Sequence, residues 1–429
     1  MKVWHERIQY AVGQGAFHTA CITVYRRNEC LHFDYVYDCG ALRRQRRTGE
    51  LTRAITLYAT KLGGRVIDAL VLSHYDQDHI NGARELVRRC AARRIYLPYL
   101  TKIHLPLLVA ADAHNLRSAA ALKSLFAMAY ARRLWGVPVT RVRRGSRDAI
   151  DNDGDLPNRT EGRRGGSVDP TPGRMVAMVQ GSNRAPSMSL RDTDALSIQA
   201  AGNAVWRLKF WNYDIDRRLL MMVNRELLGI GFPLASVRSL KGVPAVLNWL
   251  SNKSNRRQAV NAYRKAFGDF RANVRRGRVG HMSNLISLAL FSGPDGSLKK
   301  WAYCYKREGS WTHCKEGRNL NVGWLGTGDA LLGVSEIWKD FQKHYRSELG
   351  QVGTYLVPHH GAGASSGYSY YNKGLNHTPC VRSIFSYGTY NTYGHPNPVV
   401  RNEVNAVCGI PVFVHEKCSS HFFEGFWLS

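Results

Sequence analysis

A short apolar segment that runs directly into a cluster of ionisable residues most constrains how this chain can fold. Residues 66–72 are typical of a buried strand, and residues 82–90 have helical spacing. The residues between them include four potential metal ligands: His74, Asp76, Asp78 and His79. A strand that turns into a helix through such residues places them at its carboxyl end, where α/β sheets bind ligands.

The spacing within this cluster predicts room for two ions. His74 and Asp76 are separated by one residue, so an extended backbone points both side chains the same way. Asp78 and His79 lie where the chain turns into the helix and can face a second ion. Two ions about 3.5–4 Å apart activate water and clamp a phosphoryl group, which makes phosphoryl chemistry the first hypothesis.

Strands and helices alternate on both sides of a basic middle block, which predicts an α/β layered fold. Residues 141–280 hold 26 basic and 12 acidic residues, and we interpret them as an insertion that is mainly helical and loop-rich. Within it, residues 143–195 lack an apolar period, which predicts a long mobile loop. The flanking segments, 1–140 and 281–429, would form the two halves of one domain.

The charge balance predicts a polyanionic partner. Sixty Lys and Arg residues against 32 Asp and Glu give a net charge of +28, and nucleic acid is the first such partner to consider, with anionic lipid second. The sequence contains no apolar stretch of about 18 residues and its start does not resemble a signal peptide. We therefore expect a cytoplasmic protein without a membrane partner. Nine Cys without a CxxC pair argue against a disulfide scaffold.

Seven short motifs together resemble one family. The HxDxDH pattern at 74–79 resembles the HxHxDH signature of the metallo-β-lactamase fold, with Asp in place of the second His. This variant is similar to the metallohydrolase domain of ComEC-type competence proteins. Further segments resemble that family in the same order: Val12–Gly15, Asp38–Gly40, Asn284–Leu290, Gly326–Asp329, Pro358–Gly361 and Ser386–Pro396. Ala16 departs from the pattern, which has an acid there, and the family's membrane channel is absent from this chain.

The resemblance implies an αββα sandwich and two divalent metal ions, Zn²⁺ or Mn²⁺. His74 and Asp76 would hold one ion, and Asp78 and His79 the other. Asp329 would bridge both ions. His360 would complete the set, and Asp38 would either orient the ligand loop or simply cap its own strand.

The remaining residues of the predicted site would contact the substrate. Catalysis is assigned to Asp78, as a metal ligand, and to His359 and His395, which could contact a phosphate or protonate a leaving group. Which of His359, His360 and His395 ligates metal stays open, with His360 favoured. Substrate contacts are expected from Ser287, Asn391, Arg256, Arg257, Arg275 and Arg276.

Together, site and charge predict a two-metal phosphodiesterase that cleaves nucleic acid, with DNA the favoured substrate. One alternative is a hydrolase of a small, cyclic or linear, nucleotide phosphodiester, and another is a nucleic-acid-binding module without catalysis. Because a basic nuclease in the cytoplasm would be toxic without control, we expect a regulated effector, in defence against phage, with a regulatory protein partner.

Overall fold

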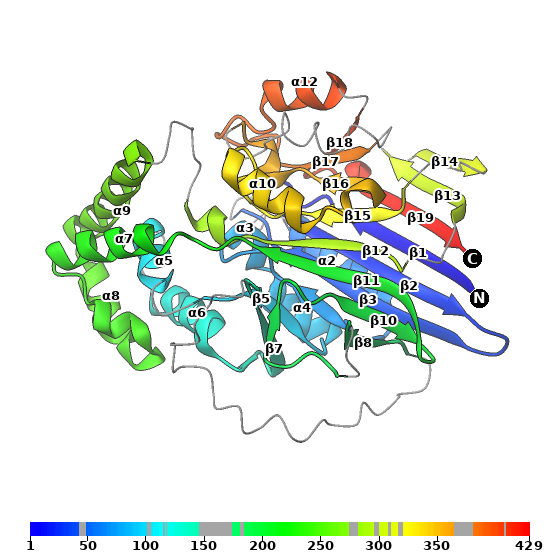
Figure 1. The fold of residues 1–429 in the computed structure, drawn as a ribbon, viewed down its shortest axis with the longest axis horizontal. Coiled ribbons are helices and arrows are strands. Elements are labelled where there is room, and N and C mark those ends of the chain that lie inside the picture. Colours follow the sequence, from blue (N-terminus) through cyan, green and yellow to red (C-terminus); the bar gives the residue numbers. More distant parts are fainter. Residues whose placement is uncertain are drawn as a thin grey trace.

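Two β-sheets packed face to face form the body of the molecule in a computed structural model of the chain (Figure 1). The structure describes residues 1–42, 49–100, 104–114, 116, 118–145, 174–180, 184–273, 282–295, 300–307, 310–315, 321–363, 381–406 and 409–429. Among these residues, no helix is long and apolar enough to cross a membrane.

The first sheet is antiparallel at one edge and parallel where the predicted ligand loop leaves it. Strands β3, β4, β5 and β7 run parallel to one another. The order across the sheet is β14 (Ser310–Lys315), β13 (Lys300–Arg307), β19 (Phe422–Leu428), β1 (Lys2–Gln9), β2 (Phe17–Tyr25), β3 (Cys30–Cys39), β4 (Ala69–Val71), β5 (Ile95–Pro98), β7 (Val137–Arg143) and β6 (Arg133–Leu134), and β9 (Ser189–Arg191) pairs with β7.

The second sheet has the same division into a parallel and an antiparallel part. Strands β15 to β18 are parallel, whereas β8, β10, β11 and β12 are antiparallel. Its order is β18 (Ile410–Val414), β17 (Arg382–Ser386), β16 (Val352–Leu356), β15 (Gly323–Gly326), β12 (Leu288–Pro294), β11 (Asn203–Asn212), β10 (Leu196–Ala200) and β8 (Val176–Val179).

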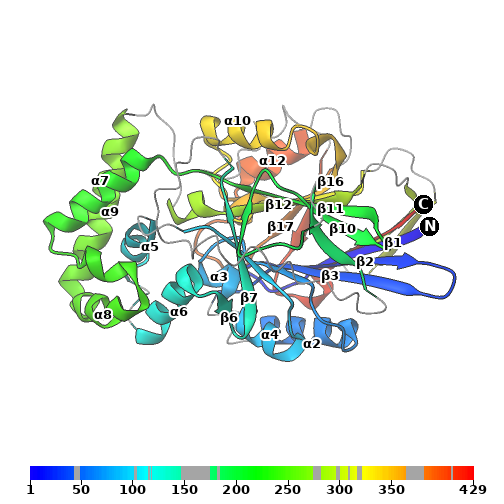
Figure 2. The same cartoon turned by 60° about the horizontal axis from the view of Figure 1, so that its bottom comes forward.

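Helices cover the outer faces of both sheets, as the sequence predicts for an αββα sandwich. Figure 2 shows α2 (Glu50–Leu62) and α4 (Ala83–Cys90) on one side and α10 (Ser335–His344) and α12 (Pro398–Ala406) on the other. Helix α2 forms because Leu51, Ile55, Tyr58 and Leu62 fall on one face and are buried. It ends at Gly63, which takes the left-handed conformation that glycine adopts without strain.

Five further helices gather at one end of the sandwich (Figures 1 and 2). This helical lobe consists of α5 (His104–Ala111), α6 (Ala119–Tyr130), α7 (Arg217–Gly229), α8 (Val243–Ser251) and α9 (Lys253–Asn273). Helix α9 packs against α5, α7 and α8, while α6 packs against α8. Helices from before and after residue 141 therefore share one lobe.

The middle block is more integrated with the sheets than its composition suggests. The prediction of a mobile loop over 143–195 is wrong for the part that the structure describes, because β8 and β9 lie there. Their backbone hydrogen bonds to neighbouring strands supply the order that a missing apolar period does not. Residues 146–173 and 181–183 lie outside the described residues, and the division at 140 and 280 stays a prediction.

The core between the sheets is aromatic. Tyr35, Trp206, Trp324 and Phe426 are fully buried there. The Ser292 hydroxyl joins the two layers because both the Tyr35 hydroxyl and the Trp206 indole N–H donate to it, at 2.8 Å each. This rigid layer fixes the strand ends from which the predicted site residues project.

Candidate metal centre

Parallel strands of both sheets end at one place, and the predicted ligands follow those ends. His74 comes three residues after β4, and the short helix α3 (Gln77–Ile80) carries Asp78 and His79. From the second sheet, Asp329 follows β15 and His360 follows β16. The site is therefore built by both halves of the sandwich, at the carboxyl ends where α/β sheets bind ligands.

His74, His79 and Asp329 form the first group of donors that could hold an ion. His79 Nε2 lies 3.1 Å from Asp329 Oδ1, and His74 Nε2 lies 3.6 Å from Asp329 Oδ2. All three side chains are buried, yet His74 Nε2, His79 Nε2 and Asp329 Oδ1 make no hydrogen bond within the described part of the chain. Buried polar atoms normally have partners, so three converging donors without one fit a metal ion.

Asp78, His79 and His360 form a second group that shares His79 with the first. Asp78 Oδ2 lies 3.2 Å from His360 Nε2, and the rings of His79 and His360 are 5.4 Å apart. The two groups are thus adjacent. This arrangement provides donors on both sides of His79 that could hold neighbouring ions.

Each of the three histidines is held by its other ring nitrogen. His79 Nδ1 donates to Asp38 Oδ2 at 2.8 Å, and His360 Nδ1 donates to the Ser386 carbonyl at 2.7 Å. The Ser73 hydroxyl donates to Asp38 Oδ2 at 2.7 Å and so accepts from His74 Nδ1 at 2.8 Å. Because Nδ1 carries the proton in every case, Nε2 presents a lone pair to the site, as metal-binding histidines do.

Asp38 is the residue that ties these supports together. Its Oδ1 accepts from the Ser73 backbone N–H at 2.6 Å, and its Oδ2 contacts both the Ser73 hydroxyl and His79. It is fully buried and has a φ of 58°, a left-handed conformation that is uncommon for a residue other than glycine. The geometry places Asp38 behind the ligand loop, where it orients His79.

Two glycines allow the backbone of the ligand loop to lie against the neighbouring turns. A Cβ at Gly40 would come within 2.5 Å of the Asp78 carbonyl oxygen and of His79 N, and one at Gly15 within 2.7 Å of the same oxygen. Ala16 N donates to that carbonyl at 3.2 Å. The glycines of the predicted motifs at 12–15 and 38–40 are therefore required by close backbone approach.

Asp76 is placed less favourably than the sequence predicts. Its Oδ2 lies 3.8 Å from His74 Nε2, its side chain is 37% exposed, and it belongs to neither donor group. It occupies the N-cap position of α3 with an extended backbone. The alternation that predicts a shared direction for His74 and Asp76 stops there, because the chain begins to turn.

His359 and His395 lie beside the donor groups. His359 Nε2 is 3.6 Å from Asp329 Oδ2, and its Nδ1 accepts from Asn284 Nδ2 at 3.2 Å. The His395 ring is 5.4 Å from that of His359 and 6.4 Å from that of His360. His360 is thus the one of the three candidates that belongs to a donor group, as favoured from the sequence.

The electrostatics of the cluster favour positive charge at its centre. Burial opposes protonation of His79, but the carboxylates of Asp329 and Asp38 outweigh it and raise its pKa well above the usual value. Burial likewise opposes ionisation of Asp78, yet its hydrogen bond to His360 and the nearby His79 lower its pKa to about 2. Buried carboxylates that stay ionised are suited to bind a cation.

The predicted substrate contacts fall into three classes. Ser287 is buried at the site's edge, and its hydroxyl has no hydrogen-bond partner among the described residues. Asn391 instead organises its own loop, because Nδ2 donates to the Gly388 and His395 carbonyls and Oδ1 accepts from the backbone N–H of Tyr393 and His395. Its amide is already hydrogen-bonded within the loop, and its role as a phosphate contact stays a prediction.

The predicted arginine contacts lie away from the donor groups. Arg256 donates to the carbonyls of Leu250 and Ser251, which closes the end of α8, so its role there is structural. Arg257 is exposed on α9, which both views place apart from α3 (Figures 1 and 2). Arg275 and Arg276 lie outside the described residues.

Two residues near the site were missed from the sequence. Ser73 links Asp38 to His74, but a serine between a strand and a histidine carries no distinctive signal. Tyr393 is 64% exposed, and its ring stacks on that of His395 at 5.8 Å. An aromatic residue two positions before a predicted catalytic histidine is a sequence signal that could have indicated a substrate contact.

Comparisons with known proteins agree with this fold. Residues 32–174, which include the ligand loop, match the metallo-beta-lactamase superfamily. Together with the two sheets and their outer helices, the match identifies the predicted metallo-β-lactamase fold. The match ends before Asp329, and the finer resemblance to ComEC-type domains stays a prediction.

Similarity to solved structures is low. MEM-A1, a subclass B3 metallo-beta-lactamase from a soil metagenome library, is 18% identical over 23% of this chain, with a TM-score of 0.14. The chain spans about a third (35%) of the length of MEM-A1. Unliganded yeast PDE1 is 8% identical over 99% of both chains, with a TM-score of 0.33. Neither likeness bears on the substrate. No curated protein matches the sequence.

Proposed function

We propose that this chain is a metal-dependent phosphodiesterase that cleaves nucleic acid, with DNA as the favoured substrate. The observation that carries the proposal is the pair of adjacent donor groups that share His79. When bound, two divalent ions, Zn²⁺ or Mn²⁺, would supply the Lewis acidity that phosphodiester hydrolysis requires. His74, His79 and Asp329 would hold one, and Asp78 and His360 would hold the other.

His359 and His395 suit hydrogen-bond donation to the substrate. Burial and the neighbouring His360 and His359 lower the pKa of His395 to about 4, so its imidazole is neutral near pH 7. Burial also lowers the pKa of His359. Since His359 Nδ1 accepts from Asn284, the proton is on Nε2, which faces the donor groups. A neutral imidazole with a fixed N–H can stabilise a phosphate oxygen.

An aromatic rim beside the site favours a polymeric substrate with accessible bases. Tyr390 and Tyr393 are 68% and 64% exposed, on the loop that Asn391 closes with its hydrogen bonds. Bases of single-stranded nucleic acid stack on exposed aromatic rings, whereas duplex bases already stack on one another. The rim therefore supports a single-stranded segment as the substrate.

The helical lobe provides positive charge for a polyanion. Residues 214–268 contain ten basic and three acidic side chains. Some are paired, as Lys265 is with Glu226, while Arg257 and Arg264 are exposed on α9. Such charge attracts nucleic acid without reading its sequence. Because unregulated cleavage would harm a cell, the proposal includes a regulated effector of phage defence with a protein partner.

Side-by-side digestion tests the proposal. The protein is stripped with a chelator, reloaded with Mn²⁺ or Zn²⁺, and assayed on single-stranded DNA, duplex DNA, RNA and bis-p-nitrophenyl phosphate. We expect cleavage of DNA that depends on metal and is lost in His79→Ala but kept in His114→Ala, a change of the same kind at an exposed position. Turnover of only the small ester would favour a small-nucleotide hydrolase, and DNA binding without turnover would favour a binding module.

A further inference from the structure

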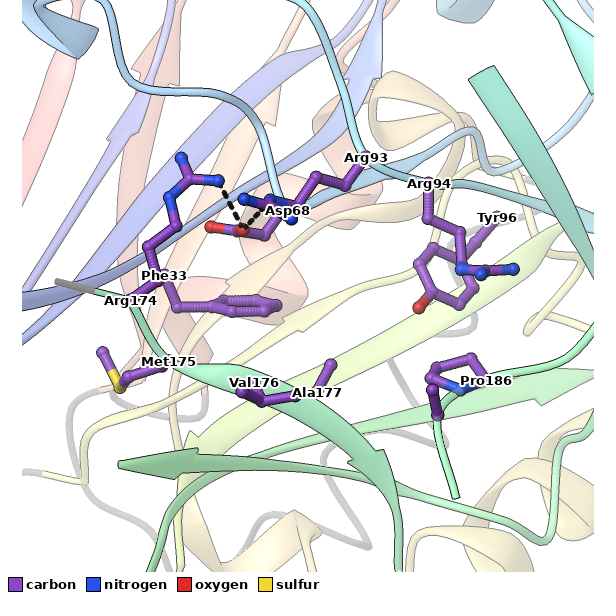
Figure 3. Close-up of a pocket in the computed structure, with 11 residues that line it drawn as sticks. Phe33, Asp68, Arg93, Arg94, Tyr96, Arg174, Met175, Val176, Ala177 and Pro186 are labelled. Atoms are coloured by element: carbon purple, nitrogen blue, oxygen red, sulfur yellow. Dashed lines mark ion pairs between the residues drawn. The ribbon is translucent and has the colours of Figure 1, made fainter. Parts of the chain in front are cut away.

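A cavity of about 260 Å³ lies between the two sheets, at the opposite end of β4 from the donor groups (Figure 3). Phe33, Asp68 and Tyr96 line it from the first sheet, and Val176 and Ala177 of β8 line it from the second. Asp68 precedes β4 and His74 follows it, and six residues of extended chain span roughly 20 Å. The cavity is therefore separate from the candidate metal centre.

Positive charge is in excess around this cavity. Arg93 Nε and Arg174 Nη1 lie 3.3 and 3.7 Å from the same oxygen of Asp68. Among the described residues, Arg94 contacts only neutral groups, donating to Thr140 Oγ1 at 2.9 Å and to the Ser187 carbonyl at 3.3 Å. Three guanidinium groups thus face one carboxylate. Guanidinium is also the side-chain group that best matches phosphate.

The hydroxyl of Tyr96 points into the same space. Tyr96 is 1% exposed, and no residue in the described ranges hydrogen-bonds its hydroxyl. Figure 3 shows this oxygen directed into the cavity, and stacking on Phe210 at 5.3 Å between ring centres holds the ring in place. A hydroxyl that borders a cavity can donate to or accept from a bound molecule that reaches it.

The rest of the lining is apolar and suits a flat ring. Phe33 and Met175 are 2% and 4% exposed, and Ala177 and Pro186 complete that wall. The cavity thus combines an apolar wall, a fixed hydroxyl and an excess of guanidinium. We propose that it binds a nucleoside monophosphate, with the base against the apolar wall and the phosphate near the arginines. This site does not depend on the proposed phosphodiesterase activity.

Calorimetric titration of the full chain in a chelator tests the proposal, because the chelator removes metal-dependent binding at the other site. AMP and CMP are the probes, and adenosine and inorganic phosphate are the controls. We expect saturable binding of a monophosphate that is at least about tenfold tighter than binding of either control, since each control lacks half of the recognised groups.

Variants of the cavity lining should change nucleotide affinity in opposite directions. Tyr96→Phe removes one hydrogen bond and should weaken binding about fivefold, and Arg94→Ala should weaken it about tenfold or more. Asp68→Asn removes the competing carboxylate and should tighten binding. His79→Ala should leave it unchanged. Thermal melts of each variant identify any that does not fold.

Two results would overturn the assignment. One is an absence of saturable binding to the wild-type protein at millimolar AMP and CMP. The other is equal affinity in wild type, Tyr96→Phe and Asp68→Asn, which would place any bound nucleotide elsewhere on this basic surface.

Discussion

The two ends of the buried strand β4 lie beside clusters of opposite charge preference. At the carboxyl end, ring nitrogens of His74 and His79 lie 3.6 and 3.1 Å from the Asp329 carboxylate, which attracts positive charge. At the amino end, Arg93 and Arg174 share the one carboxylate of Asp68, and positive charge is in excess. The first donor group is buried, whereas Arg93 is 47% exposed, but the sign of the charge still decides that one end suits a cation and the other an anion.

The strongest test of this contrast is His79→Ala, because His79 belongs to both donor groups. The variant should lose bound metal and lower the rate of phosphodiester hydrolysis by on the order of a thousandfold or more. Metal analysis and turnover of bis-p-nitrophenyl phosphate measure both effects. Nucleotide binding at the other end of β4 should persist. If His79→Ala hydrolysed the ester at the wild-type rate, the metal centre would have no part in the reaction.

The second test compares two residues of the second sheet. Asp329 contacts His74, His79 and His359, whereas His395 lies beside the donors. Asp329→Ala should therefore lose most of its metal, while His395→Ala should retain its metal and hydrolyse phosphodiesters more slowly. Metal content per chain after gel filtration decides between them. If His395→Ala emptied the site and Asp329→Ala did not, the assigned roles would be reversed.

The third test concerns the anion-binding end and pH. Burial raises the pKa of Asp68 to about 6, above the value of about 3.9 in an unfolded chain. A raised pKa in the folded state gives stability that is complete below the unfolded pKa and lost as pH rises through the folded one. Between pH 4 and 7 the free energy of unfolding of the wild type should fall by up to about 3 kcal/mol, and that of Asp68→Asn should not show this fall. Urea unfolding of both proteins across that range measures the difference; parallel curves would contradict it.

A smaller effect is expected at the aromatic rim. Tyr393→Ala should slow cleavage of single-stranded DNA about tenfold, because stacking of one base on an aromatic ring contributes about 1–3 kcal/mol. Tyr393→Phe should retain the rate, and bis-p-nitrophenyl phosphate, which lacks a base, should be hydrolysed equally by all three proteins. Abasic residues placed along the strand would locate the stacked base. Equal rates for Tyr393→Ala and wild type on DNA would exclude the rim from binding.

The smallest effect is expected in the helical lobe. Replacing Arg257 and Arg264 with Ala should flatten the dependence of log affinity on log salt by about 0.7 per lost contact with single-stranded DNA. Arg256→Ala is the matched control, because Arg256 bonds the end of α8. Arg256→Ala should lower the melting temperature and leave the salt dependence of DNA affinity nearly unchanged. An unchanged slope in the Arg257 and Arg264 variant would mean that these side chains only solvate the surface.

Local patterns predicted the elements that local physics determines. The buried face of α2 and its Gly63 cap follow from residues within one helix. The loop from His74 to His79 was predicted because an apolar strand and a helix bracket it. Helical periodicity and the strand-to-helix transition both lie within about ten residues of sequence, which makes them visible without a structure.

Long-range pairing explains what the sequence did not reveal. Strand β1 pairs with β19, so Val3 lies opposite Leu428, and no local pattern links them. Tyr96 and Arg174 likewise line one cavity only because β8 packs across from β5. The role of Asp76 stays a prediction, because the alternation that pairs it with His74 ends where the chain turns into α3.

The contact of Gly15 and Gly40 with the backbone around Asp78 has a consequence for mutational tolerance. Side chains at a crowded position can usually repack around a larger neighbour, but here the obstructing atoms belong to the main chain of the ligand loop. Any larger residue must displace Asp78 and His79 together. In a library randomised at 15, 40 and 42, active clones should therefore keep glycine at the first two positions while the third, Leu42, which is partly exposed, varies.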